Sequence, residues 1–350
     1  MTSTRTLNPL VLLLAFGAAA GHAAEAWQIE SRVVPPPAGA SEALRESIAA
    51  TPAPDLDSRR RSVPRTRAEW DAAIAERAAA RPVSLEDLER TFAVDIARDR
   101  IAGVRVHRIT PQRPQPAHEG HLFLYVHGGA YVYGGGDSGI TEAAVIARMA
   151  GMDVISIDYR MPPAHPFPAA VDDVVDVYRD VLDGHAPGAI AMGGTSAGGG
   201  LALAAVHRFK ALDLPVPGAV YAGTPWADLT KTGDTLFTNE GLDRVLVTYD
   251  GSLGAAARLY ADGHDLTDPL LSPVYGDFSG FPPVYLVTGT RDLFLSDTAR
   301  THRKLRQAGV MADLNVYEGM SHAGYAFNQS APEWRQVYGE LAAFLQAHLD

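Results

Sequence analysis

The sequence contains no cysteine, and acidic residues outnumber basic ones. The absence of cysteine excludes disulfide bonds, thiolate metal sites and a cysteine nucleophile, but it leaves the compartment open. The 350-residue chain has a formal net charge of −11 at pH 7. That balance argues against a nucleic-acid-binding face and against docking on an anionic membrane surface.

Long apolar runs are also missing after the N-terminus, and the run near the start is short. Arg5 precedes an apolar stretch over 10–20, and Gly21-His22-Ala23 or Ala24-Glu25-Ala26 then offers a small-residue cleavage site. This pattern predicts a cleaved export signal over 1–26 and a periplasmic or secreted protein. A buried first helix and a membrane anchor are the alternatives, but the run is short for a bilayer span. No cysteine follows it for lipid attachment.

What the sequence does contain is a glycine-rich turn between an apolar run at 189–193 and a helical pattern that begins near Leu201. The turn reads Gly194-Thr195-Ser196-Ala197-Gly198. Small neighbours permit a strained strand-to-helix turn that exposes the serine. The start of the following helix offers N–H groups to a developing oxyanion. Ser196 is therefore the candidate nucleophile, although the same pattern by itself also fits a turn without chemistry.

From about residue 91 the hydrophobic pattern alternates between strands and helices. The expected strands cover 93–98, 103–109, 122–126, 153–158, 189–193, 218–222, 283–288 and 312–317. The expected helices cover 140–150, 169–182, 197–211, 296–308 and 332–348. Such alternation predicts an α/β fold with a mostly parallel sheet and helices on both faces. Ligands then bind beyond the carboxyl ends of the strands.

Residues 27–90 contain helical patterns with no strand between them. We expect them to form a separate cap and linker in front of a catalytic domain at 91–350, with 223–282 completing the cap. The basic run at 59–61 is interpreted as a solvated loop rather than an anion site. In this interpretation the cap shapes a substrate pocket, and Trp226 is either a wall of that pocket or a core residue.

Further candidates follow three other strands. Gly128 and Gly129 come after 122–126, where their N–H groups can point at one oxyanion together with that of Ala197. Asp292 follows 283–288 and His322 follows 312–317. These positions give the chain order Ser, Asp, His of α/β-hydrolases.

Five further side chains near these motifs have a less direct assignment. Asp297 shares the loop of Asp292 and is the alternative acid, although its place at a helix start gives it an adequate structural role. His127 and His165 are interpreted as structural. Asp158 is expected to form a charge network with Arg160 that braces the scaffold.

Three motifs occur in the same order as in a known family. They are His127-Gly128-Gly129, the block Asp158-Tyr159-Arg160 with His165-Pro166-Phe167-Pro168-Ala169-Ala170, and Gly194-Thr195-Ser196-Ala197-Gly198-Gly199. From about residue 90 to the C-terminus the chain resembles the bacterial hormone-sensitive-lipase-like (family IV) esterases, in the branch with threonine before the nucleophile. Ala130 departs from the pattern, since many members have a third glycine there.

The resemblance implies an α/β-hydrolase fold with an N-terminal helical cap and a serine carboxylesterase acting on short-chain esters. No metal or organic cofactor is implied, and a homodimer is left open. Ser196 would attack the ester, His322 would transfer the proton and Asp292 would orient the imidazole. A lactone hydrolase with the same machinery is the alternative enzyme. A non-catalytic ligand-binding protein is the alternative from another class.

Overall fold

The computed structural model describes residues 33–80 and 82–350, so the expected export signal over 1–26 lies outside the described residues. Residues 36–350 form one compact unit. Its division into a cap and a catalytic domain stays an interpretation. Within the described residues, no helix is long and apolar enough to cross a membrane.

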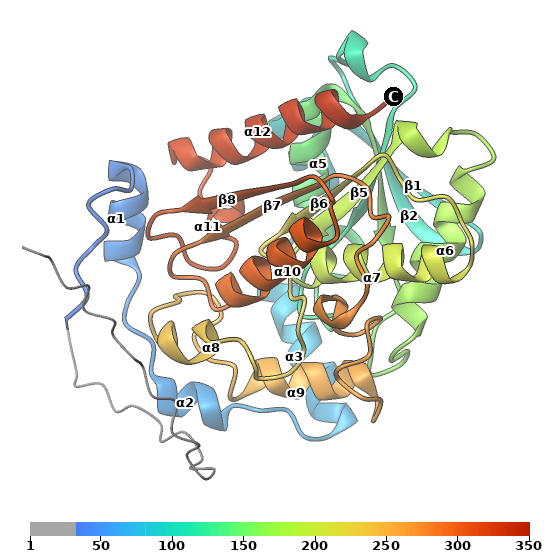
Figure 1. Cartoon of the computed structure of the whole chain (residues 1–350). Helices are drawn as coiled ribbons and strands as arrows, with labels where there is room; N and C mark the ends of the chain where they lie inside the picture. Colours follow the sequence, from blue (N-terminus) through green and yellow to red (C-terminus); the bar gives the residue numbers. More distant parts are fainter. Residues whose placement is uncertain (1–32, 81) are drawn as a thin grey trace, which may run out of the picture. The chain divides into compact units, whose positions relative to one another are not determined.

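The unit is built on one eight-stranded sheet (Figure 1). The strands are β1 Val94–Ile101, β2 Val104–Pro111, β3 Leu122–Val126, β4 Asp153–Asp158, β5 Ile190–Thr195, β6 Ala219–Gly223, β7 Val284–Gly289 and β8 Ala312–Tyr317. Their order is β1-β2-β4-β3-β5-β6-β7-β8. β2 is antiparallel to both of its neighbours, β1 and β4. All the other neighbouring strands pair in parallel. The sheet confirms the predicted α/β fold.

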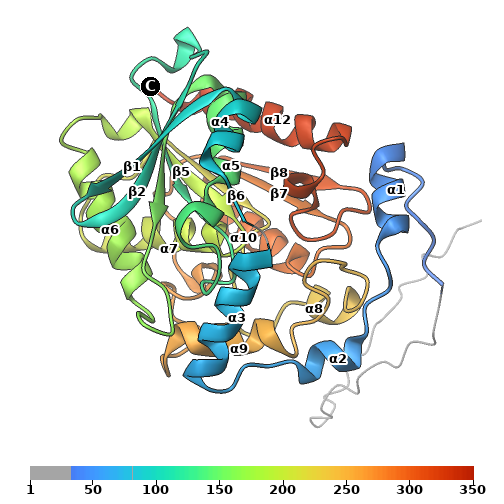
Figure 2. The same ribbon diagram turned by 180° about the vertical axis from the view of Figure 1, so that it is seen from behind.

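Helices cover both faces of the sheet (Figures 1 and 2). α5 Thr141–Ile146 and α12 Pro332–His348 pack with one set of strand side chains. α6 Ala169–Val181, α7 Ala197–Ala211 and α10 Leu295–Gln307 pack with the other set. Because both faces are covered, β3 is apolar and buried along its whole length, as is usual for central parallel strands.

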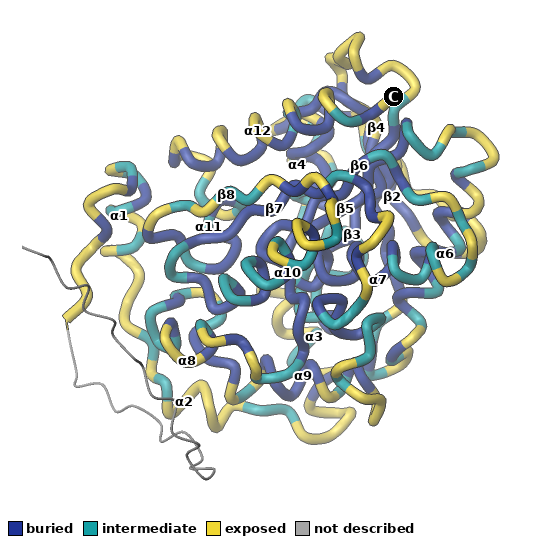
Figure 3. Tube along the Cα trace, in the orientation of Figure 1, coloured by how far each residue is buried: buried dark blue, intermediate teal, exposed yellow. Residues whose placement is uncertain are grey.

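Four helices precede the sheet: α1 Glu42–Ala50, α2 Leu56–Arg61, α3 Arg67–Ala80 and α4 Leu85–Phe92. α2 corrects the expectation of a loop around the basic run. Asp55 caps this helix by accepting a hydrogen bond from the Ser58 N–H at 2.9 Å. The arginines are exposed, and Arg60 forms an ion pair with Glu240 at 2.7 Å. Figure 3 colours the trace by burial, and exposed segments appear around α2.

The long connection between β6 and β7 contains α8 Thr235–Thr238 and α9 Ser252–Ala261. α9 meets α3 in a small apolar cluster with the loop that follows β3. In that cluster Trp70 of α3 is 3% exposed and packs with Val132, Ala255 and Ala256. The N-terminal helices and the β6–β7 connection therefore cover the same end of the sheet.

Charged groups near β4 pair differently from the expected network. Arg105 of β2 contacts Asp158 at 2.7 Å, and Arg160 contacts Asp173 of α6 at 2.7 Å. Asp158 and Arg160 thus brace separate elements, because the antiparallel register places Arg105 directly opposite Asp158.

Candidate active site

Ser196 occupies a sharp turn between β5 and α7. Its φ of 64° and ψ of −124° are unusual for a residue other than glycine. The Ser196 N–H donates to the Gly223 carbonyl at 2.7 Å, and its carbonyl accepts from the N–H groups of Gly200 and Trp226, each at 3.0 Å. The turn is therefore held by main-chain bonds to the end of β6 and to its own helix.

The glycines after β3 lie against this turn. A Cβ added to Gly128 would lie 3.5 Å from the Ser196 Cβ and 2.7 Å from the Thr195 carbonyl. Gly129 has a φ of 117°, which other residues rarely adopt. Ala197 is the first residue of α7, so its N–H is at a helix start. The three predicted oxyanion donors thus come from the two strand ends next to Ser196.

His127 and Tyr159 support the same loop. Their rings stack with centroids 4.1 Å apart, and the Tyr159 hydroxyl donates to the His127 carbonyl at 2.9 Å. The His127 Nδ1 lies 2.8 Å from the Gly128 carbonyl. Burial lowers the pKa of His127, which favours the neutral ring. These contacts fit a structural histidine.

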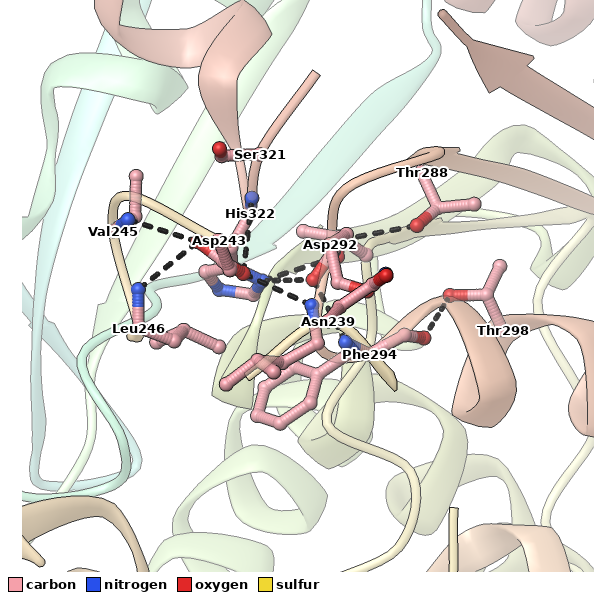
Figure 4. A network of polar contacts seen from close by, with 12 residues as sticks. Asn239, Asp243, Val245, Leu246, Thr288, Asp292, Phe294, Thr298, Ser321 and His322 are labelled. Carbon is pink, nitrogen blue, oxygen red and sulfur yellow. Dashed lines mark hydrogen bonds and ion pairs between the residues drawn. The ribbon is translucent and has the colours of Figure 1, made fainter. Parts of the chain in front are cut away.

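Asp292 and His322 meet beyond the ends of β7 and β8 (Figure 4). The His322 Nδ1 lies 3.1 Å from the Asp292 Oδ1, and both side chains are buried. Asp292 also accepts hydrogen bonds from the Phe294 N–H at 2.8 Å and from the Thr288 hydroxyl at 3.0 Å. Its carboxylate is thus oriented from several directions and faces the imidazole.

Thr224 is a contact that sequence reasoning missed. It follows β6 directly, its hydroxyl donates to the Asp292 Oδ2, and its oxygen lies 3.1 Å from the His322 Nδ1. Thr224 is fully buried. The available signal was its place at a strand end, beside the candidate residues that follow β5 and β7.

Asp243 is a second missed residue, and it comes from the β6–β7 connection. Its carboxylate accepts from the N–H groups of Leu293 at 2.9 Å and His322 at 3.4 Å, so it touches the loops of both the acid and the base (Figure 4). Burial, with the neighbouring Asp292 carboxylate, raises the pKa of Asp243 to about 6. No local pattern indicates this role, since the contacts are 50 and 79 residues away in sequence.

The alternative acid, Asp297, is directed elsewhere. It lies in the first turn of α10, as expected, but its Oδ2 accepts from the Asp228 N–H at 3.1 Å. Burial and the Asp228 carboxylate raise the pKa of Asp297 well above its usual value. Trp226 is also part of the core, fully buried and stacked on Phe294 with centroids 5.4 Å apart.

The sheet order β3-β5-β6-β7-β8 brings the candidate residues to consecutive strand ends. Asp292 contacts His322, and Gly128 lies beside Ser196. The catalytic roles of these residues stay predictions. Among the described residues, no group of three His, Asp or Glu side chains could hold a metal ion.

Comparison with known proteins agrees with the fold. Residues 123–326 match a family described as having the α/β-hydrolase fold. The chain is 34% identical to an acetyl-hydrolase of Streptomyces hygroscopicus over 245 residues, which cover 69% of this chain and 81% of that protein. It is 33% identical to an esterase of Acinetobacter venetianus over 76% of this chain and 88% of the relative.

Solved structures are similar over most of the chain. The crystal structure of esterase E25 is 49% identical, has a TM-score of 0.90 and covers 93% of this chain and 99% of that one. An esterase described as belonging to the bacterial hormone-sensitive lipase family is 31% identical, with a TM-score of 0.72 over 89% of this chain and 99% of the other.

The fold and these relatives together identify the chain as a carboxylic ester hydrolase with the α/β-hydrolase fold. The chain belongs to the bacterial hormone-sensitive-lipase-like (family IV) esterases, which confirms the resemblance drawn from the three sequence motifs.

Proposed function

We propose that the protein is a serine carboxylesterase that hydrolyses short-chain esters through an acyl-enzyme. The observation that carries this proposal is the buried Asp292–His322 contact at 3.1 Å, which lies at the strand ends beyond the turn of Ser196. A carboxylate that holds the Nδ1–H of an imidazole leaves Nε2 as the proton acceptor.

In the proposed reaction His322 removes the proton of the Ser196 hydroxyl, whose oxygen attacks the ester carbonyl carbon. The N–H groups of Gly128, Gly129 and Ala197 receive the oxyanion, each contributing roughly 3–4 kcal/mol by analogy with measured oxyanion holes. The tetrahedral intermediate collapses as His322 protonates the leaving alkoxide. Water then attacks the acyl-enzyme with the same base, which releases the acid and restores Ser196.

The proposed substrates have small acyl groups, because the family resemblance implies them and the N-terminal helices are expected to restrict the pocket. Trp70 of α3 and Ala255 and Ala256 of α9 pack with Val132, in the loop after β3. We expect this packing to limit the space for the acyl chain. Turnover of p-nitrophenyl esters is expected to peak for acyl chains of about two to eight carbons. Such a panel, with lactones included, measures kcat/KM for each class.

Two results of that panel would contradict the proposal. One is faster turnover of long-chain emulsified triglycerides than of short soluble esters. The other is a kcat/KM for lactones that exceeds those for all the open-chain esters, which would transfer the assignment to the lactone hydrolase. The panel is measured without added metal ion.

We also propose export to the periplasm or medium with removal of a signal over residues 1–26, on the basis of Arg5 and the apolar run at 10–20. Protein recovered from the native host is expected to begin near residue 27. N-terminal sequencing or intact mass measures this directly. A mature chain that still begins at Met1 or Thr2 would rule it out.

A further inference from the structure

A carboxylate that the proposed reaction does not use lies behind the turn of Ser196. Glu142, in the first turn of α5, accepts a hydrogen bond from the Thr195 hydroxyl at 2.6 Å. Thr195 is the residue before the nucleophile and is 6% exposed. Its hydroxyl oxygen also lies 2.9 Å from the hydroxyls of Tyr221 and Tyr325. We call these residues, with Tyr125 and Tyr338, the Glu142 cluster.

The donors in this cluster balance the acceptors. The Glu142 Oε1 accepts from Thr195, from Tyr221 at 3.0 Å and from Tyr338 at 3.2 Å, and its Oε2 accepts from Tyr125 at 2.9 Å. Tyr325 is then free to donate to Thr195 or Tyr221. Burial raises the pKa of Glu142 and these hydroxyl donors oppose that rise. Buried networks in which each group is satisfied hold one arrangement of the chain.

Three members of the cluster lie on segments that adjoin the Ser196 turn or the His322 loop, and Thr195 directly precedes Ser196. Tyr325 is three residues beyond His322, on α11 Gly324–Phe327. Tyr221 is on β6, two residues before Gly223, whose carbonyl accepts the Ser196 N–H. Gly223 packs so closely on the hydroxyls of Tyr221 and Tyr325 that a Cβ there would collide with both.

We infer that the Glu142 cluster is a positioning device. Through the hydroxyl of Thr195 it holds the Ser196 turn in a fixed position relative to the His322 loop. This inference rests on the proposed function. Thr195, Tyr325 and Glu142 act as positioning residues, because their contacts are to the main-chain turns and helices that carry the reacting groups. A small displacement between nucleophile and base lowers the rate of proton transfer while it leaves substrate binding unaltered.

The test compares Thr195→Val with Thr195→Ser. Valine has the shape of threonine without the hydroxyl, whereas serine retains the hydroxyl. We expect Thr195→Val to lower kcat for p-nitrophenyl butyrate about 10- to 100-fold with KM within about twofold, as expected for a misplaced reacting group. Thr195→Ser is expected to retain kcat within about threefold, since the hydroxyl that donates to Glu142 survives.

A second pair of variants keeps the inference testable if Thr195→Val does not fold. Tyr325→Phe removes the hydroxyl on the His322 side and is expected to lower kcat with little change in KM. Its matched control is Tyr178→Phe, since Tyr178 is a buried tyrosine of α6 whose hydroxyl donates to the Pro215 carbonyl at 2.9 Å. Tyr178→Phe is expected to lower the melting temperature without lowering kcat at 25 °C. If Thr195→Val does not fold, the tyrosine pair decides.

Three outcomes would overturn the inference: wild-type kcat in folded Thr195→Val or Tyr325→Phe, a loss in Thr195→Ser as large as in Thr195→Val, or an effect confined to KM. The failure of the proposed function has a different signature. In that case Ser196→Ala would retain turnover, whatever the Thr195 variants do.

Discussion

Replacing Ser196 with alanine is expected to lower kcat for short-chain esters by at least about 10⁴-fold, because the reaction then has no nucleophile. The fold should survive the change. The hydrogen bonds that hold the turn run through the Ser196 main chain to Gly223, Gly200 and Trp226, and alanine keeps all of them. Removing the hydroxyl of one small side chain on a turn costs little core packing, so the free energy of unfolding should change little.

The measurement pairs steady-state turnover with covalent labelling. Wild-type protein should react with a fluorophosphonate and gain the mass of one probe on the peptide that contains Ser196, and Ser196→Ala should gain none. Circular dichroism and thermal melting check that the variant is folded. Near-wild-type turnover in a folded Ser196→Ala protein would require another nucleophile, and absence of labelling in wild type would favour a non-catalytic binding protein.

Most of the fold follows from local sequence patterns. The eight expected strands each overlap an observed strand. The central parallel strands were predictable because they appear as short apolar runs separated by helical periodicity. The basic run was the exception. α2 is short and has no buried residue, so it leaves no amphipathic signal, and only the Asp55 cap marks its start.

The candidate site was less open to prediction. Ser196, Asp292 and His322 lie in motifs or at strand ends, where their chain order alone is informative. Asp243 and Glu142 have no such signal, because each acts through partners far away in sequence, and Thr224 had only its place at the end of β6. The same limit explains the Asp158 error: strand register, which a single sequence does not specify, brings Arg105 to that carboxylate.

The second large effect concerns the acid. Asp292→Asn is expected to lower kcat by several orders of magnitude, and the loss is about 10⁴-fold when the same change is made in trypsin. The Asp292 Oδ1 faces the His322 Nδ1 at 3.1 Å. An amide cannot both hold the Nδ1–H as an ionised carboxylate does and stabilise the imidazolium that forms during the reaction, so the imidazole loses its working tautomer.

Asp297→Asn is the matched control, in the first turn of the helix that follows the Asp292 loop, and its kcat is expected to be nearly that of the wild type. Burial and the Asp228 carboxylate raise the pKa of Asp297, which favours a neutral carboxyl, and asparagine resembles that form in shape and charge. Its amide oxygen can still accept from the Asp228 N–H. Both variants need kcat, KM and a melting temperature. An inactive, folded Asp297→Asn beside an active Asp292→Asn would transfer the role of acid to Asp297, and two active variants would remove the acid from the proposed triad.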